Sequence, residues 1–152
     1  SEINQLQGDF ECVYCVGNSI SYLQPNDLPA FYQEVFRLLV PSGVFILQVV
    51  NWEKNRETRC SDFPDIPLSE GRTFHRRYEW VDDSRLIFHP EIRKDGKTQK
   101  SWADSLYPKY HELVMADLQS AGLEVVAQLG DYKRASFDPE SSPALILVAQ
   151  KS

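Results

Sequence analysis

The 152-residue sequence has no long apolar run, few cysteines and no cluster of glycines. No stretch approaches the roughly 20 apolar residues that a membrane-spanning helix needs, and the first nine residues are polar, unlike a secretory leader. Cys12, Cys15 and Cys60 are too few for a disulfide scaffold, and three thiols cannot all pair within one chain. We therefore expect a cytoplasmic protein that does not enter the membrane.

Basic charge is also scarce, with 16 Lys and Arg against 22 Asp and Glu and a net charge of −6. Such a surface repels nucleic-acid phosphates and anionic lipid, so neither is an expected partner. The three histidines, His75, His89 and His111, have no metal-ligand spacing, and we expect no metal site. The length and the 42% hydrophobic content predict one domain over residues 1–152.

The first part of the chain alternates strand and helix patterns. Residues 10–16, FECVYCV, form a short apolar run that ends at a Gly-Asn-Ser turn, which predicts a buried strand. Apolar residues spaced three and four apart from Leu28 to Leu39 predict a helix. Residues 44–50, VFILQVV, predict a strand covered on both faces. Strand, helix, strand is a right-handed parallel crossover.

The middle of the chain reads as a loop followed by an antiparallel insert. Residues 51–71 show no sustained period and predict a long loop. Three extended runs between residues 72 and 106 predict a small β meander, because Asp95-Gly96 is a strong hairpin turn.

The pattern returns to helix and strand after Tyr107-Pro108. A helix ending at Gly122 precedes two strands, at residues 124–130 and 144–150, which are separated by a polar loop of about a dozen residues.

The segments DFECVYCVGNSISYL, LLVPSG, VFILQVVN, AGLEVVAQLGDY and ALILVAQK, in this order, resemble the C-terminal half of class I S-adenosylmethionine-dependent methyltransferases. The resemblance runs from Asp9 to Lys151 and rests on the order of elements. It implies a partial Rossmann-like α/β sheet. That family's sheet has strand order 3-2-1-4-5-7-6, and this chain would supply strands 4, 5, 7 and 6, closing with an antiparallel strand, with residues 72–106 as the inserted β meander.

One departure from the family is serious. Its cofactor site begins with an acidic residue and a Gly-x-Gly turn, whereas the seven glycines here, at positions 8, 17, 43, 71, 96, 122 and 130, are scattered. The half of the sheet that carries this motif would pair along residues 11–16. We therefore expect either a missing N-terminal half or a partner chain along this strand, whose free apolar edge would otherwise aggregate.

The candidate site residues follow the strands, because ligands of open α/β sheets bind beyond the carboxyl ends. The resemblance implies that Val16, Gly17 and Asn18 border the methionine part of S-adenosylmethionine, with Asn18 and Ser19 facing the transferred methyl. The alternative is that Gly-Asn-Ser only makes a turn. Asn51 is a candidate hydrogen-bond partner of the substrate, with Trp52 as an apolar wall; a solvated loop asparagine is the alternative.

Charge in the insert suggests a second substrate contact. Residues 72–100 carry eight basic against five acidic groups, +3 in a chain that is −9 elsewhere. Arg76 or Arg77 is thus a candidate ligand of a substrate carboxylate, although a solvated sheet face explains the same charges. Cys12 and Cys15 point to opposite faces of a strand, so they are expected to be buried apolar residues and not a redox pair.

The sequence therefore predicts methyl transfer to a small-molecule acceptor, through an in-line displacement in which positioning carries most of the acceleration. No catalytic base is identified, and the isolated chain is expected to be inactive. A noncatalytic module that docks through its open strand edge is the alternative. A different doubly wound enzyme, such as a nucleotide-binding oxidoreductase, fits the antiparallel ending around LILVAQK less well.

Overall fold

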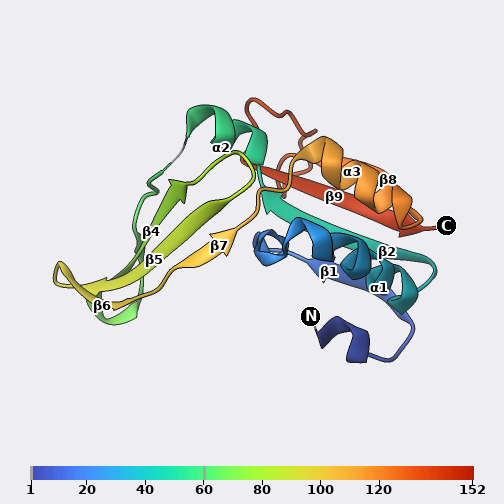
Figure 1. Ribbon diagram of the computed structural model, residues 1–152, viewed down its shortest axis with the longest axis horizontal. Coiled ribbons are helices and arrows are strands. Elements are labelled where there is room, and N and C mark those ends of the chain that lie inside the picture. Colours follow the sequence, from blue (N-terminus) through green and yellow to red (C-terminus); the bar gives the residue numbers. More distant parts are fainter. Residues whose placement is uncertain (1, 60) are drawn as a thin grey trace. The chain divides into compact units, whose positions relative to one another are not determined.

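The computed structural model describes residues 2–59 and 61–152, so the prediction about Cys60 lies outside the described residues. The chain forms two compact units. Residues 1–54 and 109–152 make the first unit, and residues 55–108 make the second, which contains the whole predicted insert. Their elements are coloured along the chain in Figure 1.

A four-stranded mixed sheet organises the first unit, in the order β1-β2-β9-β8. β1 runs parallel to β2, while β9 is antiparallel to both of its neighbours. The strands are β1 (Phe10–Cys15), β2 (Leu39–Val50), β8 (Leu123–Leu129) and β9 (Ala144–Lys151). This confirms the predicted partial α/β sheet, with the antiparallel strand in third place.

Two α-helices, α1 (Leu28–Leu38) and α3 (His111–Ser120), lie side by side on one face of this sheet, with short 3-10 segments η1 (Glu2–Gln5), η2 (Ser19–Tyr22) and η3 (Pro25–Asp27) before them (Figure 1). α1 buries Tyr32 and Val35 completely against the sheet. The Tyr32 ring meets Phe45 of β2 edge-on at 6.3 Å. Burying such side chains contributes about 1.5–3 kcal/mol each, so this layer is the main source of stability. The helix α3 ends at Ser120, and Gly122, directly after the C-cap residue Ala121, has the left-handed φ of 83° that the sequence predicts.

The other face of the sheet is only partly covered. Successive residues of β2 alternate between the faces, so Phe45 and Leu47 are buried under the helices while Val44 and Ile46 are half-buried. The expectation that this strand is covered on both faces is therefore wrong for the described chain. Its physical reason is that α1 and α3 both pack on the same side.

The strand β1 is the edge of the sheet, as the predicted strand order requires, but it is not buried, which corrects the prediction of a buried strand at residues 10–16. Phe10, Tyr14 and Val16 are 40%, 71% and 38% exposed. Cys12 is exposed too, and Cys15 is half-buried; both thiols are free. The apolar composition of this segment predicts burial, but in this chain it belongs to an edge whose outer side has no strand beside it among the described residues.

The second unit is an antiparallel sheet in the order β3-β4-β5-β6, with β7 also paired to β5. The strands are β3 (Ile66–Pro67), β4 (Arg72–Trp80), β5 (Leu86–Lys94), β6 (Lys97–Ser101) and β7 (Asp104–Leu106), and a 3-10 turn, η4 (Ser69–Gly71), precedes β4. Asp95 and Gly96 have φ of 49° and 73°, which confirms the predicted hairpin turn. One face is aromatic, with Phe63, Tyr78 and Phe88 in edge-on contact.

A short helix, α2 (Trp52–Thr58), occupies the start of the segment predicted to be a loop. Seven residues are too few for a periodic pattern to be recognised, and burial of Trp52, not propensity, fixes the helix in place. None of the described helices is both long and apolar enough to cross a membrane.

The exposed edge predicts self-association of the isolated chain. Replacing Tyr14, on β1, by Lys should weaken that association about tenfold, because one aromatic side chain is no longer buried and a charge blocks the edge. Concentration-dependent light scattering measures the effect. Tyr132→Lys is the matched control, since Tyr132 is 76% exposed in a loop. A monodisperse wild-type monomer at high concentration would contradict the prediction.

Candidate functional site

The turn that follows β1 contains two consecutive residues in the left-handed region, Gly17 at φ 71° and Asn18 at φ 63°. Glycine and asparagine are the residues that tolerate this conformation best, so the sequence encodes the turn directly. The Gly17 amide donates to Oε1 of Gln48 at 2.6 Å, and the Asn18 amide donates to the Gln48 carbonyl at 3.3 Å. The turn is therefore fastened to the neighbouring strand β2.

The Asn18 side chain points inward and joins the ends of the two parallel strands. Its Oδ1 accepts hydrogen bonds from the Ser21 hydroxyl at 2.9 Å and from the Val50 amide at 3.4 Å. The Ser21 hydroxyl in turn accepts from Nε1 of Trp52 at 3.1 Å. Both Ser21 and Trp52 are fully buried, so Trp52 is not the exposed apolar wall expected from the sequence. This network shapes the turn from within.

Ser19 and Val16 complete the outer surface of the turn. The Ser19 hydroxyl donates to the Val16 carbonyl at 2.8 Å and remains exposed together with the Val16 side chain. The structure thus brings residues 16–19 together with the end of β2, as the sequence predicts for the carboxyl ends of adjacent parallel strands.

Asn51 lies directly after β2 and is only 2% exposed, so it is not a solvated loop residue. Its Nδ2 lies within hydrogen-bond distance of the carbonyls of Asp138 (3.4 Å), Pro139 (2.9 Å) and Ser142 (2.9 Å). Its Oδ1 accepts from the Lys54 amide at 3.2 Å. The side chain therefore anchors the loop at residues 131–143 beside the end of β2.

Glu53, in the first turn of α2, holds the start of α3 in place. Its Oε1 accepts a 2.5 Å hydrogen bond from the His111 amide, one of the unpartnered donors at a helix start. Its Oε2 is buried and has no hydrogen-bond partner in the described part of the chain. The His111 ring meets Oε1 of Gln128 at 2.7 Å and lies 5.1 Å from the Phe137 ring.

Lys109, just before α3, is 3% exposed and donates to the Leu23 carbonyl at 2.7 Å. Desolvation lowers the pKa of Lys109 to about 8, and the nearby Asp117 carboxylate partly opposes this shift. Desolvation of the Asp117 carboxylate itself raises the pKa of Asp117. Sequence reasoning did not single out Lys109 or Glu53, because a charged residue in a polar stretch gives no indication of burial.

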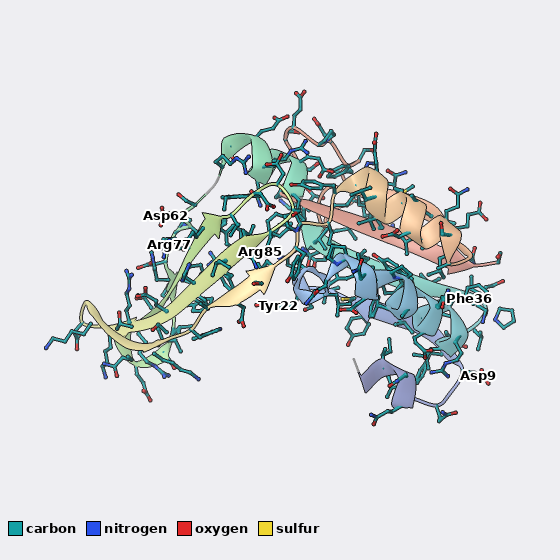
Figure 2. The ribbon with its side chains drawn as sticks, viewed as in Figure 1. Asp9, Tyr22, Phe36, Asp62, Arg77 and Arg85 are labelled. Carbon is teal, nitrogen blue, oxygen red and sulfur yellow. The ribbon has the colours of Figure 1, made fainter. Side chains whose placement is uncertain are left out.

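Arg76 and Arg77 lie on β4 in the second unit, whereas residues 16–19 and Asn51 belong to the first unit. As successive strand residues they face opposite sides of their sheet. Arg76 stacks 5.2 Å over the Phe63 ring, donates to the Pro64 carbonyl at 3.3 Å and has a buried Nε without a partner among the described residues. Arg77, labelled in Figure 2, is exposed and lies 3.9 Å from the Glu79 carboxylate. Its backbone pairs with that of Asp62 in an isolated antiparallel β-bridge.

The hydrogen bonds that Oδ1 of Asn18 accepts predict different stabilities for two substitutions of this residue. Asn18→Gly keeps the left-handed backbone and loses the side-chain acceptor, which should cost about 1 kcal/mol. Asn18→Ala loses the acceptor and also strains the backbone, for a total of about 2–3 kcal/mol. Urea denaturation gives both free energies of unfolding. Equal stability of the two variants would show that the turn does not depend on this geometry.

Buried Lys109 predicts a pH dependence with a definite sign. Its folded pKa lies below the ordinary value of 10.5, so above pH 8 the unfolded chain binds more protons and the free energy of unfolding rises with pH. The rise attributable to Lys109 should be on the order of 1 kcal/mol between pH 8 and 9. Subtracting the values for Lys109→Met isolates it, since other titrating groups are common to both proteins. A difference that does not change with pH would contradict the prediction.

No protein-family model and no curated protein sequence matches the chain. Solved structures do. A S-adenosylmethionine-dependent methyltransferase from Clostridium acetobutylicum matches all of this chain and 63% of its own, with a TM-score of 0.81 and 14% identity. The CcbJ methyltransferase from Streptomyces caelestis matches 95% of this chain and 62% of its own, with a TM-score of 0.78 and 18% identity.

A third structure, SAM-bound CalS10, is an amino pentose methyltransferase from Micromonospora echinaspora involved in calicheamicin biosynthesis. It matches 97% of this chain and 60% of its own, with a TM-score of 0.69 and 20% identity. The chain thus spans about three fifths of the length of these structures, at identities that show the fold alone. Over that span, it has the class I fold of S-adenosylmethionine-dependent methyltransferases.

Proposed function

We propose that this chain supplies the C-terminal part of a methyltransferase that moves a methyl group from S-adenosylmethionine to a small-molecule acceptor. The observation that carries the proposal is the left-handed turn at Gly17 and Asn18. It stands at the carboxyl end of β1, fastened to β2, where ligands of open α/β sheets bind. The match of the whole chain to methyltransferase structures supports the same assignment.

Val16, Gly17 and Asn18 fit one side of the cofactor. A Cβ at Gly17 would meet only the Ser19 hydroxyl, at 4.0 Å, so the space above the turn is open. The exposed Val16 side chain offers an apolar surface to the methionine chain. The amides of residues 17 and 18 already donate to Gln48, so these residues contribute shape and contact. Hydrogen-bond partners for the ribose and the amino acid group of S-adenosylmethionine must come from residues outside this turn.

A missing N-terminal half, or a partner chain, would provide those partners along residues 11–16. Exposed Phe10, Tyr14 and Val16 and the half-buried side chains Val44 and Ile46 support this part of the proposal. Burying that apolar surface would stabilise the assembly and would cover an edge that natural sheets protect. We place the assembled protein in the cytoplasm, in keeping with the few cysteines.

Bound S-adenosylmethionine supplies an electrophilic methyl, and in-line attack on it requires positioning more than covalent help. We assign this positioning to Ser19, whose hydroxyl is exposed, and to Asn51, which acts through the loop that it anchors. Arg76 or Arg77 would bind a carboxylate of the acceptor through charge-assisted hydrogen bonds. Of the two, exposed Arg77 is free of the aromatic stacking that holds Arg76.

A noncatalytic docking module is the second candidate. It is favoured by the same exposed β1 edge, which a partner chain could cover without any cofactor. The two candidates differ in whether residues 16–19 contact S-adenosylmethionine, and the experiment below uses that difference.

Titration of the isotope-labelled chain with S-adenosylmethionine, followed by amide chemical shifts, tests the proposal. We expect saturable but weak binding, with Kd about 1 mM because only one side of the site is present, and shifts at residues 16–19 and 49–51. Gly17→Val should abolish the binding by filling the space above the turn. Gly71→Val is the matched control, because Gly71 has a similar φ of 69° and open surroundings in the second unit.

Three results would count against methyl transfer. These are shifts confined to other residues, equal loss of binding in both glycine variants, or no shift at any concentration of S-adenosylmethionine below about 10 mM. If no shift occurs while Tyr14→Lys still weakens self-association, the docking module becomes the better account.

A further inference from the structure

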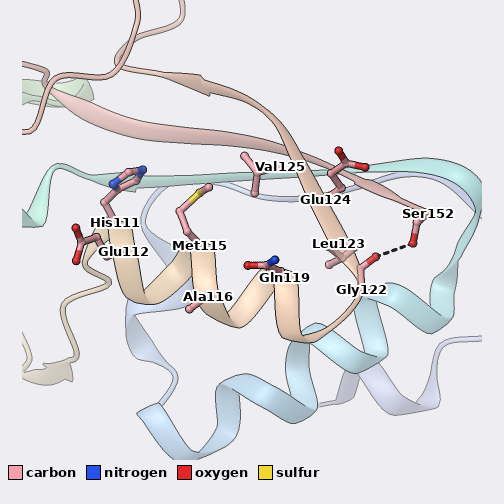
Figure 3. A pocket seen from close by; sticks show the side chains of 10 residues that line it. All are labelled: His111, Glu112, Met115, Ala116, Gln119, Gly122, Leu123, Glu124, Val125 and Ser152. Carbon is pink, nitrogen blue, oxygen red and sulfur yellow. Dashed lines mark hydrogen bonds between the residues drawn. The ribbon is translucent and has the colours of Figure 1, made fainter.

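A groove of about 760 Å³ lies between α3 and β8, on the side of the first unit formed by the last strand of its sheet (Figure 3). Met115 and Ala116 line it from the helix, and Leu123 and Val125 line it from the strand. None of the candidate cofactor or substrate residues lines this groove. It therefore needs an explanation separate from methyl transfer.

The strand β8 is an edge strand that already accepts backbone partners at one end. The Phe137 amide donates to the Gln128 carbonyl at 3.3 Å, and the Gly130 amide donates to the Ala135 carbonyl at 2.8 Å. The loop thus adds a short antiparallel bridge between Leu129 and Ser136 on the outer side of the strand. The earlier part of β8, residues 123–125, borders the groove instead. An extended chain entering the groove would continue the pairing that the loop begins.

The dimensions of the groove suit an extended segment. The helix α3 has ten residues and therefore runs for about 15 Å, which an extended chain covers in four to five residues at 3.3 Å each. Side chains of such a segment alternate, so every second one would meet the apolar floor formed by Met115, Leu123 and Val125. A groove between an edge strand and a helix is the geometry in which peptides bind by strand addition.

The charge of the residues that line the groove indicates which peptide residues it favours. The lining includes two carboxylates, Glu112 and Glu124, and no Lys or Arg among the described residues; both glutamates are exposed. The first unit as a whole carries 12 acidic and 6 basic side chains, a net charge of −6. That charge opposes a second copy of the same surface and favours a basic partner.

We propose that the groove between α3 and β8 binds an extended peptide segment of another protein, by strand addition to residues 123–125, and that it selects apolar residues alternating with basic ones. The apolar side chains occupy the groove between Met115 and Val125. The basic side chains approach Glu112 and Glu124.

A six-residue peptide of alternating valine and lysine, capped at both ends, is the probe. Titrated into the isotope-labelled chain, it should bind saturably with Kd of about 100 μM and shift the amides of residues 111–125. The same peptide with proline in place of the central valine lacks a backbone donor and should bind at least about tenfold more weakly. Equal binding of the two peptides would overturn strand addition.

Charge reversal tests the selection. Glu112→Lys with Glu124→Lys should weaken the lysine peptide about fivefold and strengthen a glutamate version of the peptide by a similar factor. Asp9→Lys with Glu11→Lys changes the net charge equally at the opposite edge of the sheet and is the control. Equal effects of the two double variants would reduce the result to general electrostatics and overturn the proposed site.

Filling the groove provides an independent check. Met115→Trp should abolish peptide binding while the melting temperature stays close to that of the wild type, because Met115 is only half-buried. Shifts that map outside residues 111–125, or binding that survives this substitution, would refute the proposal. S-adenosylmethionine binding at residues 16–19 should not change, so failure here leaves the proposed function untouched.

Discussion

The packing of α1 and α3 on one face of the mixed sheet is the constraint on which the rest of the first unit depends. The Tyr32 ring of α1 meets the Phe45 ring of β2, and both of them are fully buried, as are Val35 of the helix and Leu47 of the strand. This layer fixes the level at which β1 and β2 end beside each other. Because both strands end at this level, the turn at residues 16–19 lies beside the end of β2, which Asn51 follows directly. Hydrogen bonds from the Asn18 amide to the Gln48 carbonyl and from the Val50 amide to Oδ1 of Asn18 hold the turn there.

Hydrogen bonds inside the protein then determine what this end of the sheet offers to a ligand. Asparagine side chains often bind ligands, but those of Asn18 and Asn51 form hydrogen bonds within the chain. Oδ1 of Asn18 accepts from β2, and Nδ2 of Asn51 donates to the loop at residues 131–143. A buried polar group left without a partner is costly, which explains why Oδ1 of Asn18 and both side-chain polar atoms of Asn51 form hydrogen bonds within the chain. The outward surface is left to the backbone of Gly17, to Val16 and to the Ser19 hydroxyl. The cofactor contact that we propose at this turn would therefore rely on shape.

Periodicity and turn chemistry predicted the fold because both act locally. The hairpin at Asp95-Gly96 and the left-handed residue Gly122 follow from residues whose local preferences the structure obeys. The order of strands in the sheet came instead from the resemblance to class I methyltransferases, and the structure has that order. Burial is harder to predict, because it depends on packing between elements that are far apart in the sequence. FECVYCV was expected to be buried, and its side chains are largely exposed, while Lys109, which no sequence pattern singles out, is buried and donates to the Leu23 carbonyl. For the same reason the sequence did not reveal that the Asn18 side chain points inward.

The two edges of the sheet differ in a way that separates their roles. At β1 the exposed residues are aromatic and aliphatic, and Val44 and Ile46 continue this apolar surface onto the open face. Such a surface gains most from broad, permanent burial. At β8 the groove is lined by α3 as well as by the strand, and carboxylates are among its lining residues. Exposed charges of this kind contribute little energy but discriminate between partners, which suits a reversible contact. A chain with both features can be assembled through one edge and still engage a second partner through the other.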